Sequence, residues 1–492
     1  MQKKFILSID QSTSGTKAVL FTKDCKVHNR VTINHAQIHP CPGWVEHNPD
    51  EIIKNVKQAI IQVINESSAS WDDVAAIAIS NQRETGMVWD SVTGKPIYNA
   101  IVWQCPRAKD ICEKIKEKDL IYRKTGLNLS PYFTAPKIRW ILENVPEAGK
   151  MAESGRLKFG TMDSWVLYNL TGGKVHATDY SNASRTLLLN LNTLEWDKEL
   201  LDIFAIPLHM MPEIKPSDTI FGVTCGDNRI PDGIPISGVM GDSHAALFGQ
   251  NCYLPGMIKT TYGTGSSVMM NIGEKPVFSG SGIVTSIGWV STGETVYVLE
   301  GNINSTGKTI EWITENAELL SSPKESGTIA SKLPDNGGVY FVPAFTGLSA
   351  PYWNNDARAI ITGLTLSSRK EHIIRAAEES IVYQINDVIT LMRECSGSSI
   401  ADIRVDGGPT RDAFLMQFQA DISNAKVIVP AVEELSALGS ANMAGLATGF
   451  WKNRDEITKN RTVLKEYVPG MDLSKRQQYI QGWQEAVNRA VL

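Results

Sequence analysis

A turn near the start of the chain combines residue types that bind phosphate. Residues 10–17 read DQSTSGTK and lie between apolar runs at residues 5–9 and 18–21, so strand, turn and strand predict a β-hairpin. Its small residues would let backbone N–H groups approach an anion, Lys17 would add charge, and Asp10 could hold Mg²⁺ through water. A purely structural hairpin with solvent-facing hydroxyls is the alternative, because short motifs recur by chance.

A second turn of the same kind lies in the other half of the chain. Residues 262–267 read YGTGSS, between expected strands at residues 257–261 and 268–270. Two glycine-and-hydroxyl turns could clamp a polyphosphate from both sides, which favours the functional interpretation of both. Gly407 and Gly408 follow another strand and could admit an adenosine ring, although a tight strand-to-helix turn by itself explains them.

Asp242 is a candidate general base. It lies in the segment GDSH, just before an apolar helical pattern. A carboxylate in this place could take a proton from an attacking hydroxyl, typically an effect of about 10²–10⁴-fold on rate. Helix capping is the structural alternative, and His244 is a rival base by residue type, although a single helical histidine is more often a packing or surface residue.

Four further residues have the chemistry of a polyol pocket. Arg83 donates hydrogen bonds to hydroxyls and Glu84 accepts them, whereas the aromatic faces of Trp103 and Tyr132 would cover the C–H side of a carbon chain. Taken singly, these four are ordinary surface or core side chains.

The elements that must position these residues have an α/β pattern. Asn48 and Pro49 suit the start of an amphipathic helix, and a buried strand at residues 74–79 ends just before the Arg83 region, where ligands commonly bind in α/β sheets. Because each half of the chain opens on a similar hairpin, we expect two duplicated domains, residues 1–250 and 251–492, around a catalytic cleft.

Composition argues against several classes of protein. The 492 residues carry 48 lysines and arginines against 53 aspartates and glutamates, a net charge of −5, which argues against nucleic-acid binding as the main function. Hydrophobic residues at 42% and charged residues at 21% indicate a globular protein. No apolar run approaches about 18 residues, so we expect no membrane span. Seven cysteines without a CxxC pair predict thiols in a reducing compartment, and hence a cytoplasmic protein.

Longer stretches of the sequence resemble one family. The chain is similar over nearly its full length to the FGGY carbohydrate kinases, and within them to the members that phosphorylate glycerol. The stretches that carry the resemblance are residues 42–47, 80–85, 94–105, 179–186, 261–265 and 343–348. The resemblance implies an actin-like ATPase (ribonuclease H-like) α/β fold, Mg²⁺ and ATP as cofactors, glycerol or a similar small polyol as substrate, and a homo-oligomer, either dimer or tetramer.

The resemblance also implies roles for individual residues. The nucleotide would contact Thr13, Ser14, Gly15, Lys17, Thr264, Gly307, Glu311, Gly408 and Asp412. The polyol would contact Arg83, Glu84, Trp103, Tyr132, Asp242 and Ser243. Asp242 would be the catalytic base, and Asp10 would serve the metal.

The chain departs from the family pattern at several of these positions. Ser243 replaces the usual glutamine and Ser267 the usual aromatic residue, so both changes shrink a side chain of the expected polyol pocket. A larger and wetter pocket would favour a polyol or ketose of four or five carbons, such as erythritol, threitol, xylitol or xylulose, as the alternative substrate. Glu311 and Asp412 stand where amides are usual, which weakens the expected nucleotide contacts there.

Two other classes would share the phosphate-binding turns. An actin- or Hsp70-like ATPase would act through polymerisation or peptide binding and would have no need of the polyol residues that this chain retains. A non-catalytic sugar-sensing relative would more naturally lack Asp10 or Asp242, and both are present. The sequence therefore favours a polyol kinase.

Overall fold

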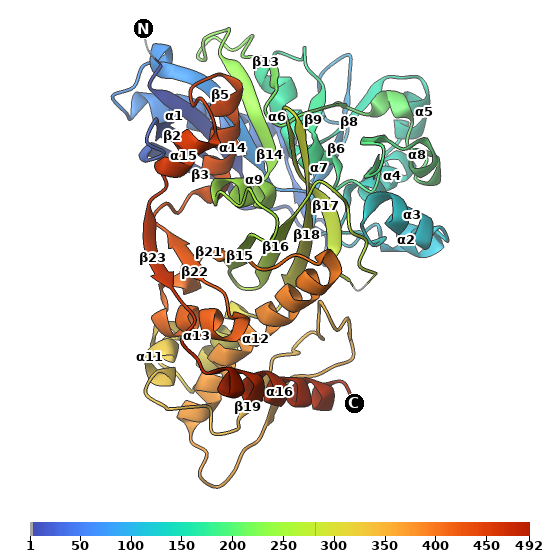
Figure 1. The fold of residues 1–492 in the computed structure, drawn as a ribbon. Helices are drawn as coiled ribbons and strands as arrows, with labels where there is room; N and C mark the ends of the chain where they lie inside the picture. Colours follow the sequence, from blue (N-terminus) through green and yellow to red (C-terminus); the bar gives the residue numbers. More distant parts are fainter. Residues whose placement is uncertain (1–2, 281) are drawn as a thin grey trace.

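Two sheets form the framework of the protein (Figure 1). In the computed structural model, which describes residues 3–280 and 282–492, the first sheet has six strands in the order β13-β14-β5-β1-β2-β3. β1 is antiparallel to β2 and parallel to β5, which is in turn parallel to β14. The strands are β1 (Phe5–Gln11), β2 (Gly15–Thr22), β3 (Val27–Asn34), β5 (Val74–Asn81), β13 (Ile220–Val223) and β14 (Pro235–Gly241).

The second sheet repeats this arrangement. Within the described residues it has seven strands in the order β17-β18-β16-β15-β21-β22-β23, with β15 antiparallel to β16 and parallel to β21. Its run β22-β21-β15-β16-β18 therefore corresponds to β14-β5-β1-β2-β3 in the first sheet, which confirms the predicted duplicated α/β fold. The strands are β15 (Ile258–Tyr262), β16 (Ser266–Gly273), β17 (Val284–Ser291), β18 (Glu294–Ile303), β21 (Ile403–Asp406), β22 (Val427–Pro430) and β23 (Val463–Tyr467).

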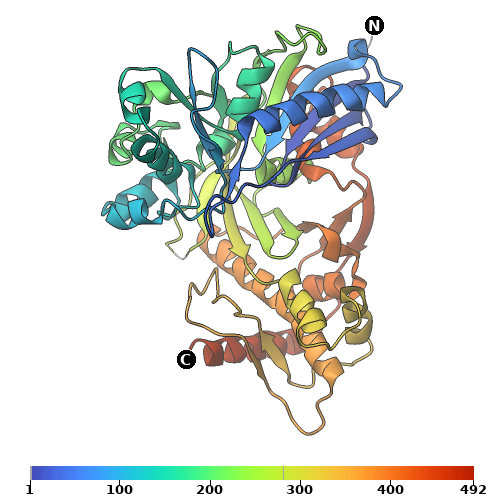
Figure 2. The same ribbon diagram turned by 180° about the vertical axis from the view of Figure 1, so that it is seen from behind.

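α1 and α14 cover opposite faces of the first sheet. α1 (Pro49–Asn65) begins where the sequence predicts, capped by the Asn48 side chain, and packs on the face of β1 that carries Leu7 (Figure 2). α14 (Leu435–Ala447) comes from the second half of the chain and packs on the other face, which carries Ile6. Successive side chains of a strand point to opposite faces of the sheet. Because α1 covers one face and α14 the other, both faces of β1 are buried. The second half thus supplies part of the core around the first sheet.

α9 (Asp242–Gly249) follows β14 directly and crosses α14 at very short range. A Cβ added to Gly439 of α14 would lie 1.7 Å from the carbonyl oxygen of Ala245 in α9. Glycine at this position therefore allows the two helix backbones to touch.

Five helices of the described residues pack against the second sheet, in the lower part of Figure 1. The apolar core there is built around α12, and α16, near the C-terminus, packs against it. These helices are α10 (Gly307–Glu315), α11 (Ser326–Ala330), α12 (Lys370–Ser396), α13 (Ala413–Ser423) and α16 (Leu473–Ala490). No helix of the described residues has the length and apolar character needed to cross a bilayer.

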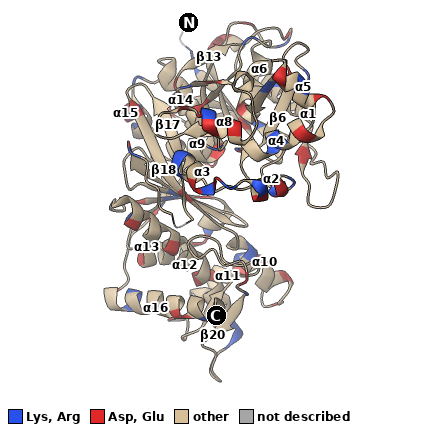
Figure 3. Cartoon of the chain, turned by 90° about the vertical axis from the view of Figure 1, so that its right-hand side faces the viewer, with Lys and Arg blue, Asp and Glu red and all other residues tan. Residues whose placement is uncertain are grey.

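Smaller elements surround the two sheets. β4 (Glu46–His47), β7 (Ala100–Ile101), β6 (Gly86–Asp90) and β8 (Leu157–Thr161) form a sheet in that order beside the first. Short strands are β9 (Ala177–Asp179), β10 (Leu189–Asn190), β11 (Glu195–Trp196), β12 (Glu213–Lys215), β19 (Tyr340–Val342) and β20 (Ile360–Thr362). The other helices are α2 (Lys109–Lys114), α3 (Lys118–Thr125), α4 (Thr134–Asn144), α5 (Ala148–Glu153), α6 (Met162–Leu170), α7 (Tyr180–Ala183), α8 (Lys198–Ile203) and α15 (Arg454–Lys459). Charges of both signs are interspersed over these elements, in keeping with the small net charge (Figure 3).

Candidate active site

The first predicted turn is a hairpin loop between β1 and β2. Asp10 pairs with Lys17 and Gln11 with Thr16, which leaves residues 12–14 as the turn and confirms the predicted hairpin. A Cβ added to Gly15 would lie 2.9 Å from the Ile33 carbonyl oxygen of β3, so the neighbouring strand requires glycine here.

Asp10 has the surroundings of a cation ligand. Its side chain is buried, and its Oδ1 has no hydrogen-bond partner among the described residues. Burial and the nearby Asp242 carboxylate raise the pKa of Asp10 to about 7. A buried carboxylate oxygen without a donor fits Mg²⁺, which takes one or two carboxylates and completes its shell with water and phosphate. The described residues contain no cluster of three or more His, Cys, Asp or Glu that could hold a metal by themselves.

Two residues of the first hairpin are already engaged by other side chains. Lys17 Nζ lies 2.7 Å from Glu434 Oε2 at the start of α14, and Arg30 Nη1 lies 2.8 Å from the other Glu434 oxygen. Thr13 Oγ1 accepts a hydrogen bond of 2.9 Å from Trp103 Nε1. The turn is therefore tied directly to a residue of the expected polyol pocket.

The second predicted turn is also a hairpin, and it is fixed to the start of α10. Tyr262 pairs with Ser266, and the Gly307 N–H donates to the Gly263 carbonyl at 3.0 Å. A Cβ on Gly307 would lie 2.4 Å from that carbonyl oxygen, so close packing of the turn on α10 requires glycine. Thr264, in the centre of the turn, has an exposed side chain.

The Gly407–Gly408 turn lies beside the second hairpin because β21 pairs with β15. Gly407 has φ 99° and a Cβ there would lie 1.9 Å from the Tyr262 carbonyl oxygen, whereas a Cβ on Gly408 would meet nothing within 4 Å. Asp412 caps α13 by accepting from the N–H groups of Phe414 and Leu415. The structure thus brings Thr264, Gly307 and Gly408 to one edge of the second sheet.

Glu311, a further expected nucleotide contact, is a partly exposed residue of α10. Its carboxylate is 40% exposed and forms an ion pair with Lys308, one helical turn earlier. Such a pair at the surface contributes little to stability, so the side chain remains free to rearrange.

Asp242 is the first residue of α9, at the carboxyl end of β14. Its side chain is 36% exposed, and Arg83 Nε lies 3.2 Å from its Oδ1. The Ser243 N–H also donates to this oxygen at 2.6 Å. His244, the rival base, is fully buried and its Nε2 contacts Ser286 Oγ at 3.0 Å, while burial holds its pKa well below the usual range. The accessible carboxylate is therefore the better placed of the two bases.

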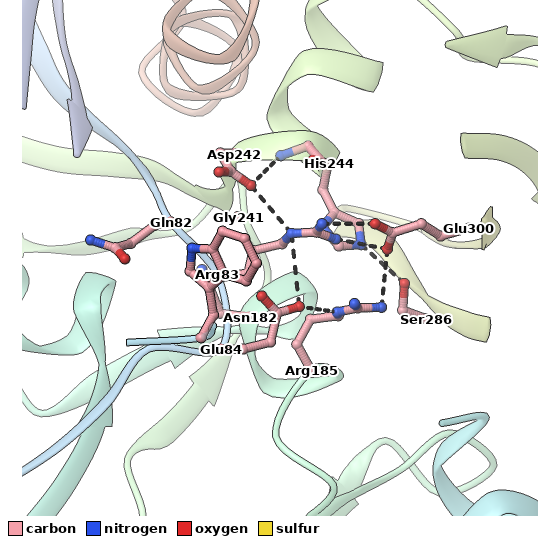
Figure 4. A network of polar contacts seen from close by, with 12 residues as sticks. Gln82, Arg83, Glu84, Asn182, Arg185, Gly241, Asp242, His244, Ser286 and Glu300 are labelled. Carbon is pink, nitrogen blue, oxygen red and sulfur yellow. Dashed lines mark hydrogen bonds and ion pairs between the residues drawn. The ribbon is translucent and has the colours of Figure 1, made fainter. Parts of the chain in front are cut away.

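Arg83 and Glu84 belong to a buried ring of alternating charges (Figure 4). Both Nη atoms of Arg83 donate at 2.8 Å to the two oxygens of Glu300, on β18 of the second sheet. Arg185 bridges the remaining gap, with Nη1 3.0 Å from Glu300 Oε2 and Nε 2.5 Å from Glu84 Oε1. The two arginines hold the pKa of Glu300 well below its usual range in spite of its burial. Glu84 also has φ 61°, an unusual backbone for glutamate that concentrates at functional sites.

Trp103 and Tyr132 form an aromatic wall next to this ring. Their ring centroids are 5.6 Å apart with edges facing, and burial beside Glu84 raises the pKa of the Tyr132 hydroxyl. Beneath them the buried Lys137 Nζ donates to the backbone carbonyls of Tyr132 and Phe133. The charges of Glu84, Arg83 and Arg185 all act on the pKa of the Tyr132 hydroxyl, so Tyr132 lies near the charge ring.

Glu300 and Arg185 are the members of this site that sequence reasoning misses. Arg185 lies within residues 179–186, which carry the family resemblance, but nothing in that stretch assigns it a role. Glu300 is a charged residue in the apolar strand pattern TVYVLEGN. A charge within an apolar strand is the one local indication of a buried, paired carboxylate there.

The two sheets and the two turns define a two-domain α/β protein of the actin-like ATPase class. The N-terminal domain of the FGGY family of carbohydrate kinases matches residues 5–249, and its C-terminal domain matches residues 258–448. The chain belongs to the FGGY family of carbohydrate kinases.

Curated relatives match along the whole chain. Glycerol kinase 1 of Thermotoga maritima is 51% identical and covers 99% of both chains, and the glycerol kinase of Halothermothrix orenii is 47% identical over 100% of this chain and 99% of its own. Among solved structures, Plasmodium falciparum glycerol kinase with ADP has a TM-score of 0.95 at 37% identity, over 100% of this chain and 99% of that one. A xylulose kinase from Lactobacillus acidophilus, at 24% identity and TM-score 0.88 over 99% of this chain and 98% of that one, shares the fold.

Proposed function

We propose that the protein is a kinase that transfers the γ-phosphoryl group of ATP to a terminal hydroxyl of glycerol. The observation that carries the proposal is the accessible Asp242 carboxylate, held by Arg83 at the carboxyl end of β14. The full-length relatives named glycerol kinase support glycerol as the acceptor, and the solved relative with ADP supports an adenine nucleotide as the donor.

The side chains around the polyol would each have a different role in binding or catalysis. Asp242 takes the proton of the attacking hydroxyl as the phosphoryl group is transferred in line. Arg83 has five N–H groups, of which two donate to Glu300, so the others remain for polyol hydroxyls and for the ion pair of Nε with Asp242. Glu84 accepts hydrogen bonds from the polyol, Ser243 contacts it, and Trp103 and Tyr132 cover its C–H face.

The nucleotide would lie between the two hairpins. Backbone N–H groups and hydroxyls at Thr13, Ser14 and Gly15 would contact the phosphates from one side, and Thr264 and Gly307 from the other. Lys17 would contact the phosphates once its ion pair with Glu434 is broken. The adenosine would lie near Gly408, Asp412 and Glu311. Mg²⁺ held near Asp10 would supply neutralisation of the negative charge on the phosphates.

An Asp242→Asn variant tests the proposed base. We expect kcat with ATP and glycerol to fall by about 10²–10⁴-fold, because the amide cannot accept the proton, with the dissociation constant for ATP changed less than about threefold. Asp455→Asn is a matched control, since Asp455 is an exposed aspartate in the first turn of α15. Unchanged turnover of Asp242→Asn would remove Asp242 from this role.

A larger polyol or ketose is the second candidate substrate. The observation that favours it is Ser267 Oγ, which is buried without a hydrogen-bond partner among the described residues. Met269 of β16 pairs with Glu300 of β18, and Ser267 is two residues before Met269 on the same strand. Because alternate side chains of a strand point to the same face, Ser267 and Glu300 lie on the same face of the sheet. We expect a panel of glycerol, erythritol, threitol, xylitol and xylulose to rank the substrates by kcat/KM. A glycerol preference of orders of magnitude would exclude this candidate.

We further propose the domain division at residues 1–250 and 251–492, a cytoplasmic location and a homo-oligomer. The spans of the two matched family domains support the division. All seven cysteines lie within the described residues and are unpaired thiols, which suits a reducing compartment. Light scattering on the purified protein would distinguish a dimer or tetramer from a monomer.

A further inference from the structure

Glu300 is a buried carboxylate of the second sheet that contacts the polyol residues of the first half. It lies on β18, opposite Met269 of β16 and Val284 of β17, so strands on both sides fix its backbone. Its side chain has no solvent exposure, and both oxygens face arginine side chains.

The geometry of these contacts determines the orientation of Arg83. A guanidinium group is a rigid planar fork, and Glu300 binds both of its Nη atoms at 2.8 Å. With the fork fixed in this way, Arg83 Nε is directed toward Asp242, at 3.2 Å. The angle at which Arg83 meets the base is therefore set by Glu300.

Glu300 fixes Glu84 through a second arginine. Arg185 reaches Glu300 with Nη1 and Glu84 with Nε. The sequence of contacts Asp242–Arg83–Glu300–Arg185–Glu84 joins the candidate base to the candidate hydroxyl acceptor, with Glu300 in the centre (Figure 4). Both arginines are almost fully buried, so each depends on these carboxylates for its hydrogen bonds.

We propose that Glu300 is a positioning residue for the polyol site: it holds the Arg83 fork away from Asp242 and Glu84, so that both carboxylates stay available to the substrate. Without this partner, Arg83 would pair its fork with one of those two carboxylates, which lie within 4.0 Å of its Nε. The inference rests on the proposed polyol kinase activity and deepens it, because it assigns control of polyol binding to a residue of the second sheet.

Glu300→Gln is the sharpest test because it keeps the size of the side chain. Two Arg83 nitrogens donate to the two Glu300 oxygens, and Arg185 Nη1 forms an ion pair with one of them, whereas glutamine offers one oxygen and an NH₂ group that would oppose a donor. A shift of Arg83 by about 1 Å costs roughly 10²-fold in rate. We therefore expect kcat/KM for glycerol to fall about 10²-fold, with KM for glycerol raised at least tenfold and KM for ATP changed less than twofold.

Glu294→Gln is the matched control. Glu294 begins the same strand, forms an ion pair with Arg454 and accepts from Trp289 Nε1 at 2.6 Å. The control should leave both KM values unchanged. Because part of the effect of Glu300 passes through Arg83, we also expect Glu300→Gln to cost less in kcat/KM when Arg83→Ala is already present than it does in the wild type.

The outcomes separate this inference from the proposed function. A wild-type protein without activity on any polyol of the panel would refute the proposed function, and the inference with it. An active wild type with Glu300→Gln within twofold of it, or with equal rises in KM for ATP and glycerol, would overturn the inference alone. If Glu300→Gln does not fold, Glu300→Asp, which keeps the charge but withdraws it by one methylene, should show the same KM split, and its absence would overturn the inference.

Discussion

The contact between α14 and α9 connects packing to catalysis, and Gly439→Ala would disturb it. The added Cβ would lie 1.7 Å from the Ala245 carbonyl oxygen and 2.9 Å from the Gly249 nitrogen. Since ordinary contact begins near 3.4 Å, the helices would have to separate by about 1.7 Å. α9 begins at Asp242, so this separation would displace the candidate base.

The size of the effect follows from two opposing terms. Overpacking of a close backbone contact costs about 3 kcal/mol at the upper end, and replacing a helical glycine by alanine returns about 1 kcal/mol. We expect the free energy of unfolding to fall by about 2 kcal/mol. A displacement of Asp242 by 1 Å or more should lower kcat by about 10²-fold.

Urea unfolding and a coupled assay of ADP release would measure both quantities on the same preparation. Gly149→Ala is a matched control, because Gly149 is also helical and its added Cβ would be 3.5 Å from the nearest atom, an ordinary contact. If Gly439→Ala retained both the stability and the kcat of the wild type, the argument that backbone contact with α14 positions α9 would be wrong.

Three further predictions concern the site and its supports. Trp103 and Thr13 share one hydrogen bond, so the effects of Trp103→Phe and Thr13→Val on kcat/KM should be non-additive by about 1 kcal/mol, roughly fivefold, in a double-mutant cycle. Strict additivity would argue against that bond. Burial lowers the pKa of Lys137 from its ordinary 10.5 to about 7, so unfolding takes up a proton between these pH values and the free energy of unfolding rises with pH across them. Lys137→Met should lack that rise when its urea unfolding is compared at pH 7 and about pH 9.5. An equally steep rise in the variant would contradict the assignment. Asp412→Ala should lower the free energy of unfolding by about 1 kcal/mol through loss of the α13 cap, whereas Asp412→Asn should keep it; equal losses would refute the capping role.

The features that the sequence predicts well are local ones. Both hairpins were predictable because a few consecutive turn residues specify each of them. The start of α1 was predictable for the same reason, since Asn48 caps its own next turn. Asp242 at the start of α9 also follows from adjacent residues.

The features that the sequence did not predict depend on distant pairs. Glu300 is 217 positions from Arg83, and Arg185 is 101 positions from Glu84. Lys17 was expected to face phosphate, but its partner Glu434 is 417 positions away. No local pattern specifies which buried charges meet across two sheets, because only the completed fold brings them together.

The origin of α14 has a consequence for synthesis of the chain on the ribosome. About 190 residues separate the end of β14 from the start of α14. At a synthesis rate of 5–20 residues per second, one face of the first sheet would remain uncovered for roughly 10–40 s until α14 is made. This face carries Ile6, Val19 and Phe21. The nascent first half would therefore present an apolar surface to chaperones during that interval.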